Sequence, residues 1–293
     1  MASTANSASA ANQAATANGP TAANSVTILE QGRVGGIGDV GRGAGKPAAG
    51  GGGGGVEVTR QDDIIHWWKG EDLTDSVGSA DLIANNSAGT AAGVGVNGET
   101  VLATDGVDQW WHTADVDIAL TDAFSVSVWV QSREASTTVY TGANQSFLTW
   151  GGDTNALYGH WLGPHASQAG WMYAQAHLDD DPDSGTYIRE MHFDDQAPII
   201  DPTDWVLWTH TWASGNAPKL YSNADLSETG TAVSGTLDNV TTGENAHFGI
   251  GRKHMAGSGY AFSGYYQQIR VYDVELSASD VSDIYNSGAG DWS

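Results

Sequence analysis

The sequence predicts an all-β fold, a two-sheet antiparallel jelly-roll sandwich that follows a low-complexity, extended N-terminal arm. From residue 56 onward, short runs of alternating apolar and polar residues are separated by Gly, Asn and Asp turns, which is typical of sandwiches and jelly rolls. Only residues 278–285 read as a helix, with Ser277 as N-cap and Asp280 in the first turn. We therefore assign residues 1–55 to the arm and 56–293 to the jelly roll.

The arm differs in composition from the rest of the chain. It begins with a stretch rich in Ala, Ser, Thr and Asn, continues with an apolar island at residues 26–30, and ends in a Gly-rich tract up to residue 55. Such a segment cannot bury enough apolar surface to fold alone. One interpretation is a flexible linker. The other is an attachment arm whose island docks on a partner protein.

The predicted strands follow in order along the jelly roll. Residues 63–68 and 73–78 resemble the first strand and the following turn of a jelly-roll family whose most specific motifs lie in the last third of the chain. Residues 101–111 resemble the hairpin of the same family, with an Asp-Gly-x-Asp turn that Asp105 and Asp108 stabilise, the alternative being a metal or ligand role for them. In residues 124–130 the even-numbered side chains are apolar and occupy one face of a strand, with the odd-numbered ones on the other face.

The last third of the chain carries the most specific pattern. The segment WVLWTHTW at residues 205–212 predicts a buried strand, KLYSN follows at 219–223, and FSGYYQQIRVYDVELS at 262–277 precedes the helix. This order resembles the laminin-G-like jelly roll of the concanavalin A-like lectin/glucanase superfamily, with its W-x-H-x-x-x-T strand, L-Y-x-N-G hairpin and following strand pair. The resemblance covers roughly residues 60–287 and implies a binding scaffold that is an enzyme only in some branches.

The resemblance also implies roles for several prominent residues. His210 corresponds to a strand histidine of the family, and we expect a sheet residue there rather than a catalyst. Four tryptophans occupy strand positions that the family fills with core residues: Trp67, Trp129, Trp208 and Trp212.

The charge of the chain narrows the choice of partners. There are 35 acidic and 11 basic residues, for a formal net charge of −24, and no cysteine. Nucleic acid and anionic membranes are poor partners because the few Lys and Arg residues are spread out. An Asp-rich, Lys-poor surface favours a high-salt habitat, where the screening length falls to about 3 Å in molar salt. The alternative is an ordinary acidic protein selected for solubility.

Motifs for enzymatic chemistry are missing from the sequence. The glucanase branch uses a Glu-x-Asp-x-x-Glu strand whose paired carboxylates act as nucleophile and general acid, and that spacing does not occur here. The sequence also contains no Gly-x-Ser-x-Gly, His-Glu-x-x-His or Gly-Lys-Ser/Thr motif. We therefore predict a protein that is not an enzyme.

An acidic segment at residues 179–190 is the candidate metal site. Asp179, Asp181 and Asp183 stand at positions 1, 3 and 5 of a twelve-residue loop, and Glu190 stands at position 12. Calcium takes six to eight oxygen ligands, which closely spaced carboxylates can supply. The glycine expected at position 6 is displaced to Gly185, so this is no EF-hand. The alternatives are a structural Ca²⁺ site and a solvated acidic loop.

Aromatic residues gather in an insertion-like region at about 150–203. Exposed aromatic faces can stack on pyranose rings, whereas buried ones pack cores and subunit interfaces. The candidate glycan-binding residues are His160, Trp161, His165, Trp171 and Tyr173. We expect the two histidines and Trp161 in a loop, and we expect Met172 and Ala174 to mark a buried face of the strand that holds Trp171 and Tyr173.

Together these observations favour a non-enzymatic structural protein of the virion surface, such as a turret, fibre or decoration. In this hypothesis the arm contacts other virion proteins, and a lectin-like homo-oligomer binds a host-surface glycan or stabilises the particle. The N-terminus lacks the features of a signal peptide, and no apolar run approaches a membrane span. The alternatives are a carbohydrate-binding module of a cell surface and, less favoured, a glycoside hydrolase.

Overall fold

A computed structural model describes most of the predicted jelly roll. The described residues are 58–114, 122–133, 146–150, 160–164, 171–177, 187–193, 204–237, 247–252, 261–286 and 290. All of them belong to the compact unit Gly53–Ser293. The arm predicted at residues 1–55 lies outside the described residues.

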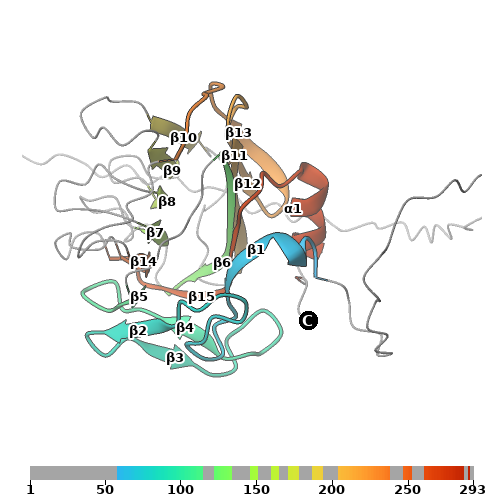
Figure 1. The fold of residues 1–293 in the computed structure, drawn as a ribbon. Coiled ribbons are helices and arrows are strands. Elements are labelled where there is room, and N and C mark those ends of the chain that lie inside the picture. The colour runs from blue at the N-terminus through green and yellow to red at the C-terminus, as the bar shows by residue number, and fades with distance from the viewer. Residues whose placement is uncertain are drawn as a thin grey trace, which may run out of the picture. The chain divides into compact units, whose positions relative to one another are not determined.

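The described residues form fifteen strands, one 3-10 turn and one α-helix (Figure 1). The 3-10 turn is Gln61–Asp63 and the helix is α1 (Ala278–Tyr285). The strands are β1 (Ile64–Trp68), β2 (Leu82–Asn85), β3 (Gly89–Ala91), β4 (Val101–Ala103), β5 (Trp110–Thr113), β6 (Ala123–Ser132), β7 (Leu148–Trp150), β8 (His160–Pro164), β9 (Trp171–His177), β10 (Tyr187–Phe193), β11 (Val206–Ala213), β12 (Lys219–Ser222), β13 (Asp225–Thr229), β14 (Phe248–Ile250) and β15 (Gly264–Tyr272). No helix among these residues is long and apolar enough to cross a membrane.

The strands assemble into two antiparallel sheets, which confirms the predicted sandwich. The eight-stranded sheet has the order β13-β12-β11-β6-β15-β4-β3, and β1 also pairs with β15. The seven-stranded sheet has the order β10-β9-β8-β7-β14-β5-β2. β15 pairs with β4 at Tyr265 and Tyr266 and with β1 from Ile269 onward. The register of β15 against β6 shifts between Gln267 and Arg270, and Gln268 between them has a φ of +49°.

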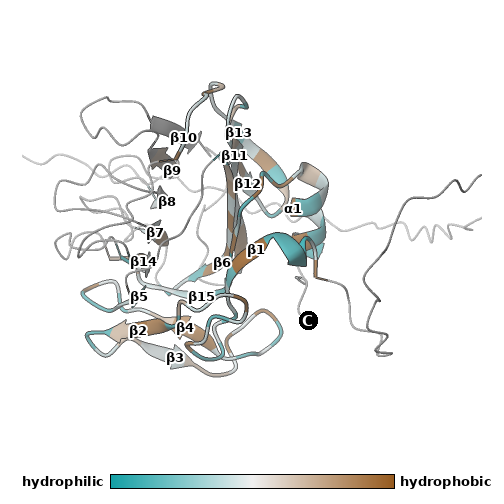
Figure 2. Ribbon diagram, in the orientation of Figure 1, coloured by the Kyte–Doolittle hydropathy of each residue, from teal (hydrophilic) through white to brown (hydrophobic). Residues whose placement is uncertain are grey.

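The inner faces of the two sheets share one apolar core. Apolar side chains alternate along β6 and β11 because successive residues of a strand point to opposite faces, and the apolar stretches of both strands are visible in Figure 2. The eight-stranded sheet contributes Trp68, Leu102, Phe124, Val126, Val128, Trp208, Trp212, Leu220, Tyr266, Ile269 and Val271. The seven-stranded sheet contributes Leu82, Trp111, Leu148, Leu162, Met172, Ala174, Ala176, Phe248 and Ile250.

A second apolar cluster covers the outer face of the eight-stranded sheet. Val281 and Ile284 of α1 are buried in it together with Trp129 and Leu207 of the sheet, and Trp129 stacks on Tyr285 with ring centroids 5.7 Å apart. The predicted helix is confirmed, including its cap. The Ser277 side chain accepts a hydrogen bond from the backbone N–H of Asp280, and the Asp280 carboxylate accepts one from the backbone N–H of Ser277.

The predicted hairpin at 101–111 is wrong, because its two arms belong to different sheets. β4 pairs with β15 and β3, whereas β5 pairs with β14 and β2. The turn is confirmed for Asp105, whose Oδ1 accepts the backbone N–H groups of Val107, Asp108 and Gln109, whereas Asp108 contributes its backbone N–H to it. Before this turn, Thr104 donates its hydroxyl to the carbonyl of Phe262. That contact holds the end of β4 on the eight-stranded sheet while the chain crosses to the other sheet.

Other expectations for the last third are mostly confirmed. β12 and β13 form the predicted hairpin, and both turn residues, Asn223 and Ala224, have positive φ, as a two-residue type I′ turn requires. In contrast, residues 262–277 contain one bulged strand, β15, rather than a strand pair. The four tryptophans predicted for packing are all buried. His210 is fully buried on β11, and burial lowers its pKa to about 3.

Candidate ligand-binding face

The outer face of the seven-stranded sheet is formed by the positions that alternate with its core residues. Trp111 of β5, Leu148 of β7 and both Phe248 and Ile250 of β14 are core residues. Their neighbours within the strands therefore stand on the outer face. Among the described side chains these are Trp110, His112 and Thr149, with Gly249 between the last two in the sheet.

Strand pairing extends this face as one continuous row across the sheet. Ile83 of β2 pairs with His112, which pairs with Gly249. Gly249 pairs with Thr149, and Thr149 pairs with Trp161 of β8. Beyond β8 the row continues through Gln175 of β9 to Arg189 of β10. Three spacings between neighbouring strands separate His112 on β5 from Trp161 on β8, a distance of about 14 Å across the sheet.

An aromatic and histidine cluster lies at the β5 end of this row. The rings of Trp110 and His112 stack with centroids 4.7 Å apart, and the ring of His247 meets His112 edge-on at 5.2 Å. His112 Nδ1 lies 2.8 Å from the carbonyl oxygen of Thr113, to which it donates. Partial burial lowers the pKa of His112, the hydrogen bond to Thr113 raises it, and the neighbouring His247 lowers it again. The net direction is downward, which favours the neutral imidazole.

The middle of the row is closely packed rather than open. A Cβ at Gly249 would approach Thr149 Oγ1 to 2.8 Å and the backbone oxygen of Arg252 to 3.2 Å. Thr149 also donates its hydroxyl to that Arg252 oxygen, at 3.4 Å. The backbone after β14 therefore lies against the sheet here and separates the β5 end of the row from β8.

Four of the five predicted glycan-binding residues lie on neighbouring strands of this sheet. His160 and Trp161 begin β8, so the expectation that they lie in a loop is wrong. Trp171 and Tyr173 lie in β9, where Tyr173 pairs with Gly163 of β8. The predicted buried face of β9 is confirmed, because Met172, Ala174 and Ala176 all belong to the core.

His165 lies outside the described residues. So do Asp179, Asp181 and Asp183 of the acidic segment. Glu190 lies in β10, paired with Ala174 of β9, so the last four residues of the predicted twelve-residue loop belong to a strand. Within the described ranges, no three His, Cys, Asp or Glu side chains are grouped so that they could hold a metal ion.

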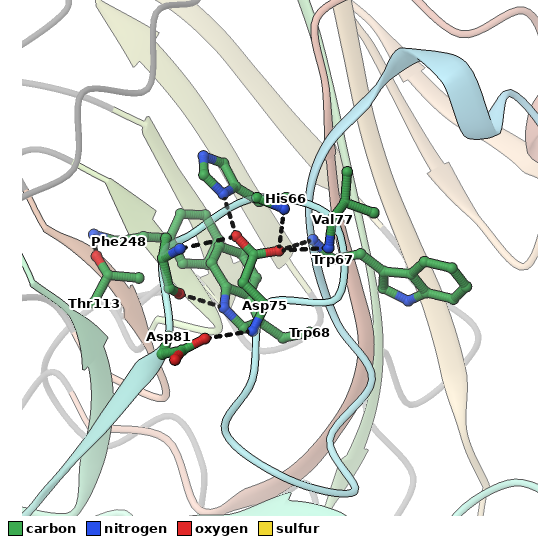
Figure 3. A network of polar contacts seen from close by, with 10 residues as sticks. His66, Trp67, Trp68, Asp75, Val77, Asp81, Thr113 and Phe248 are labelled. Atoms are coloured by element: carbon green, nitrogen blue, oxygen red, sulfur yellow. Dashed lines mark hydrogen bonds and ion pairs between the residues drawn. The ribbon is translucent and has the colours of Figure 1, made fainter.

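A buried polar network is centred on Asp75, in the predicted turn after β1 (Figure 3). His66 Nδ1 donates to Asp75 Oδ2 at 2.6 Å, and the Ala80 N–H donates to the same oxygen at 3.1 Å. Asp75 Oδ1 accepts the backbone N–H groups of Trp67, Val77 and Gly78 at 3.0–3.2 Å. Burial raises the pKa of Asp75, but these hydrogen bonds outweigh it and hold the pKa far below its ordinary value.

This network joins the two sheets and leaves no room for a side chain at Gly78. Asp75 contacts β1 of the eight-stranded sheet, while the segment it organises leads into β2 of the other sheet. The Trp68 indole N–H donates to the carbonyl of Ala80 at 2.7 Å. A Cβ at Gly78 would lie 2.5 Å from Asp75 Oδ2 and 2.6 Å from His66 Nδ1. The Asp75–His66 pair therefore fixes the crossing between the sheets.

Sequence reasoning identified the Asp75 turn but missed its partner His66, and it missed the Trp110–His112–His247 cluster. His66 and Asp75 are nine residues apart in the sequence, on a strand and in the turn after it. His112 and His247 belong to segments far apart in the sequence. Only the pairing of β5 with β14 brings them together.

Comparison with known proteins places this geometry in a family. A family model described as the concanavalin A-like lectin/glucanases superfamily matches residues 104–282. No curated protein matches the chain. Among solved structures, the binding domain of Paraclostridial Mosquitocidal Protein 1 is similar, with 13% identity and a TM-score of 0.58 over 78% of this chain and 52% of that one.

Two botulinum neurotoxin structures show the same likeness. The serotype D binding domain has 13% identity and a TM-score of 0.56, over 78% of this chain and 51% of that one. The binding domain of neurotoxin DC in complex with SialylT has 13% identity and a TM-score of 0.54, over 77% of this chain and 52% of that one. The chain thus spans about half the length of these solved chains, and the likeness shows a shared fold.

Proposed function

The chain belongs to the concanavalin A-like lectin/glucanases superfamily, and on that premise we propose that it binds carbohydrate as a lectin-like protein without transforming it. The family match over residues 104–282 carries this proposal. It includes the whole of β6, β11, β14 and β15, strands from the interior of the two sheets. One neighbour of the same fold is a botulinum neurotoxin binding domain in complex with SialylT, which is consistent with glycan recognition on this scaffold.

The outer face of the seven-stranded sheet is the proposed binding surface. The inner faces of both sheets are filled by the core, and the outer face of the eight-stranded sheet carries α1 and the second apolar cluster. On the remaining face, we propose that Trp161 of β8 and Trp171 and Tyr173 of β9 supply stacking surfaces for pyranose rings. We propose His165, which lies outside the described residues, as a further ligand for hydroxyl groups; His160 alternates with Trp161 along β8 and therefore stands on the opposite face of the sheet.

The same surface gives little support to a glycoside hydrolase. A retaining enzyme needs two carboxyl groups about 5–5.5 Å apart on either side of the scissile bond. The sequence has no Glu-x-Asp-x-x-Glu strand to supply them. Among the described residues, the two carboxylates with the most backbone donors, Asp75 and Asp105, are engaged in turns. Binding is therefore the favoured activity.

We extend the proposal to the setting in which this domain acts. The low-complexity arm at residues 1–55 and the net charge of −24 support a virion surface protein of a high-salt environment. The arm would hold the chain on other virion proteins, and several copies would present their binding faces together. Multivalent display raises the strength of weak single contacts by about 10²–10⁴. A cell-surface carbohydrate-binding module is the second candidate.

A glycan array with the full-length chain, in high salt with and without Ca²⁺, tests the proposal. We expect selective, saturable binding that W161A or Y173A abolishes. L226A is the matched control, because Leu226 is a large exposed apolar residue on β13 of the other sheet. The proposal is wrong if the folded chain binds no glycan, and the assignment of the face is wrong if W161A and L226A behave alike.

A further inference from the structure

Two imidazoles from adjacent strands approach each other at the β5 end of the seven-stranded sheet. His112 lies in β5, and His247 immediately precedes β14, which pairs with β5. Their ring centroids are 5.2 Å apart and their planes are inclined by 74°. Two imidazoles bound to one tetrahedral ion through nitrogen–metal bonds of about 2.0–2.1 Å also place their centroids about 5 Å apart. The spacing of the two rings is therefore compatible with joint coordination of one metal ion, and it is also that of an ordinary edge-to-face ring contact.

The surroundings of His112 resemble those of a metal ligand. Its Nδ1–H donates to the carbonyl oxygen of Thr113, 2.8 Å away, and this assigns the lone pair of the neutral ring to Nε2. Metal-binding histidines commonly donate their second nitrogen in this way, which fixes both the tautomer and the ring orientation. The stacked indole of Trp110, 4.7 Å away, restricts the ring further. The side chain is thus held in one orientation before any ion binds.

We propose that His112 and His247 form a two-histidine site for a divalent transition-metal ion, with water completing the coordination. Imidazole nitrogen suits Zn²⁺, Ni²⁺ and Cu²⁺, whereas Ca²⁺ and Mg²⁺ prefer oxygen ligands. The described part of the chain adds no third His, Cys, Asp or Glu to the group, so a weaker affinity than that of a four-ligand structural site is expected. The net charge of −24 raises the local concentration of cations near the site.

This site differs from the predicted calcium site in both donors and position. The acidic segment at 179–190 offers carboxylate oxygens, and its Glu190 lies on β10, at the opposite end of the sheet order from β5. The His112–His247 site offers nitrogen donors. A metal that discriminates between nitrogen and oxygen ligands therefore distinguishes the two sites. The proposal also stands independently of carbohydrate binding.

Isothermal titration of the full-length chain with Zn²⁺, in about 0.15 M salt to screen the acidic surface, tests the site. We expect saturable binding that H247Q and H112Q each weaken by about tenfold or more, because each removes one of two protein ligands. H192Q is the matched control, since His192 lies on β10, at the far end of the sheet. It should bind Zn²⁺ as the wild type does. Mg²⁺ is the charge-matched control ion and should not reproduce the Zn²⁺ isotherm.

A second measurement needs no variant and so does not depend on how the substitutions fold. In a nitrogen-detected NMR spectrum of the wild-type histidine side chains, Zn²⁺ should shift the ring nitrogens of His112 and His247 together. The proposal is overturned if Zn²⁺ does not bind, if H247Q binds it like the wild type, or if the shifted rings belong to other histidines.

Discussion

Replacing Asp75 with Asn should strongly destabilise the fold although it alters only one group of atoms. The wild-type carboxylate accepts five hydrogen bonds, two of them at Oδ2. The donors are the Nδ1–H of His66 and the backbone N–H groups of Trp67, Val77, Gly78 and Ala80. An Asn side chain keeps one oxygen, and its NH₂ group is a donor where the second oxygen stood. At least two of the five donors therefore lose their acceptor.

The magnitude follows from those two lost bonds. A hydrogen bond to a charged group contributes about 1.5–3 kcal/mol, so two of them sum to about 3–6 kcal/mol. A change of tautomer lets His66 Nδ1 accept from the new NH₂ group, which recovers part of the loss and leaves about 3 kcal/mol. For a domain of this size that loss lowers the Tm by about 6–12 °C. Urea unfolding at pH 7, followed by tryptophan fluorescence, measures it.

The pH dependence of the stability loss in D75N identifies the ionised carboxylate of Asp75 as the source of that loss. The folded-state pKa of Asp75 is lowered, so its stabilising effect is fully present above the unfolded-state pKa of about 3.9. The effect is lost as the pH falls further toward the folded-state pKa. The difference in unfolding free energy between wild type and D75N should therefore be constant near neutral pH and shrink below about pH 4.

D72N is the matched control for this experiment. Asp72 lies in the same turn and is exposed, and its side chain accepts one hydrogen bond, from the backbone N–H of Thr74. Its substitution removes the same charge and should change the unfolding free energy by less than about 1 kcal/mol. The reasoning is refuted if D75N is no less stable than D72N, or if its deficit stays unchanged down to acid pH.

Three further predictions concern separate parts of the molecule. Thr209 and Thr113 are both fully buried, but Thr113 Oγ1 accepts the Phe248 N–H, whereas Thr209 Oγ1 has no hydrogen-bond partner among the described residues. In urea unfolding, T113V should therefore lower the free energy of unfolding by about 1–3 kcal/mol, whereas T209V should leave it unchanged or raise it. Equal losses in the two variants would contradict this. S277A should lower the free energy of unfolding by about 1 kcal/mol, because it removes the N-terminal cap of α1. An unchanged urea midpoint would show that the cap does not stabilise the protein. If the acidic segment binds Ca²⁺, D181A and E190A should abolish the calcium-dependent rise in Tm; a rise that persists in both variants would place the ion elsewhere.

Elements governed by local chemistry were predictable from the sequence. The helix α1 was predicted with its bounds and its N-cap, because Ser277 and Asp280 form a capping box within four residues. β6 was recognised because its apolar side chains alternate at every second residue from Phe124 to Val130. Both signals depend on neighbours in the sequence, and neither requires knowledge of the rest of the fold.

Predictions failed where distant contacts decide the outcome. The Asp105 turn has the same hydrogen bonds whether the chain returns to the same sheet or crosses to the other one. The contact of Thr104 with Phe262, 158 residues away, marks the crossing, and no local pattern reveals it. Gly163 and Pro164 suggested a loop, yet β8 is paired on both sides, with β7 and β9.

The candidate face was only partly predictable for the same reason. Its aromatic residues could be named from composition, but their row across β5, β14, β7, β8 and β9 is defined by strand register. His112 and His247 gave no signal individually, since each is a single histidine in a short apolar segment. Their proximity depends on the pairing of Gly249 with His112.

NMR mapping of a bound glycan on the full-length chain tests the central claim most directly. With the best ligand from the array, amide shifts should concentrate on β8 and β9, while α1, β11 and β12 stay unchanged. Shifts confined to the eight-stranded sheet and α1, or no saturable shift with any glycan, would contradict a carbohydrate-binding function for the outer face of the seven-stranded sheet.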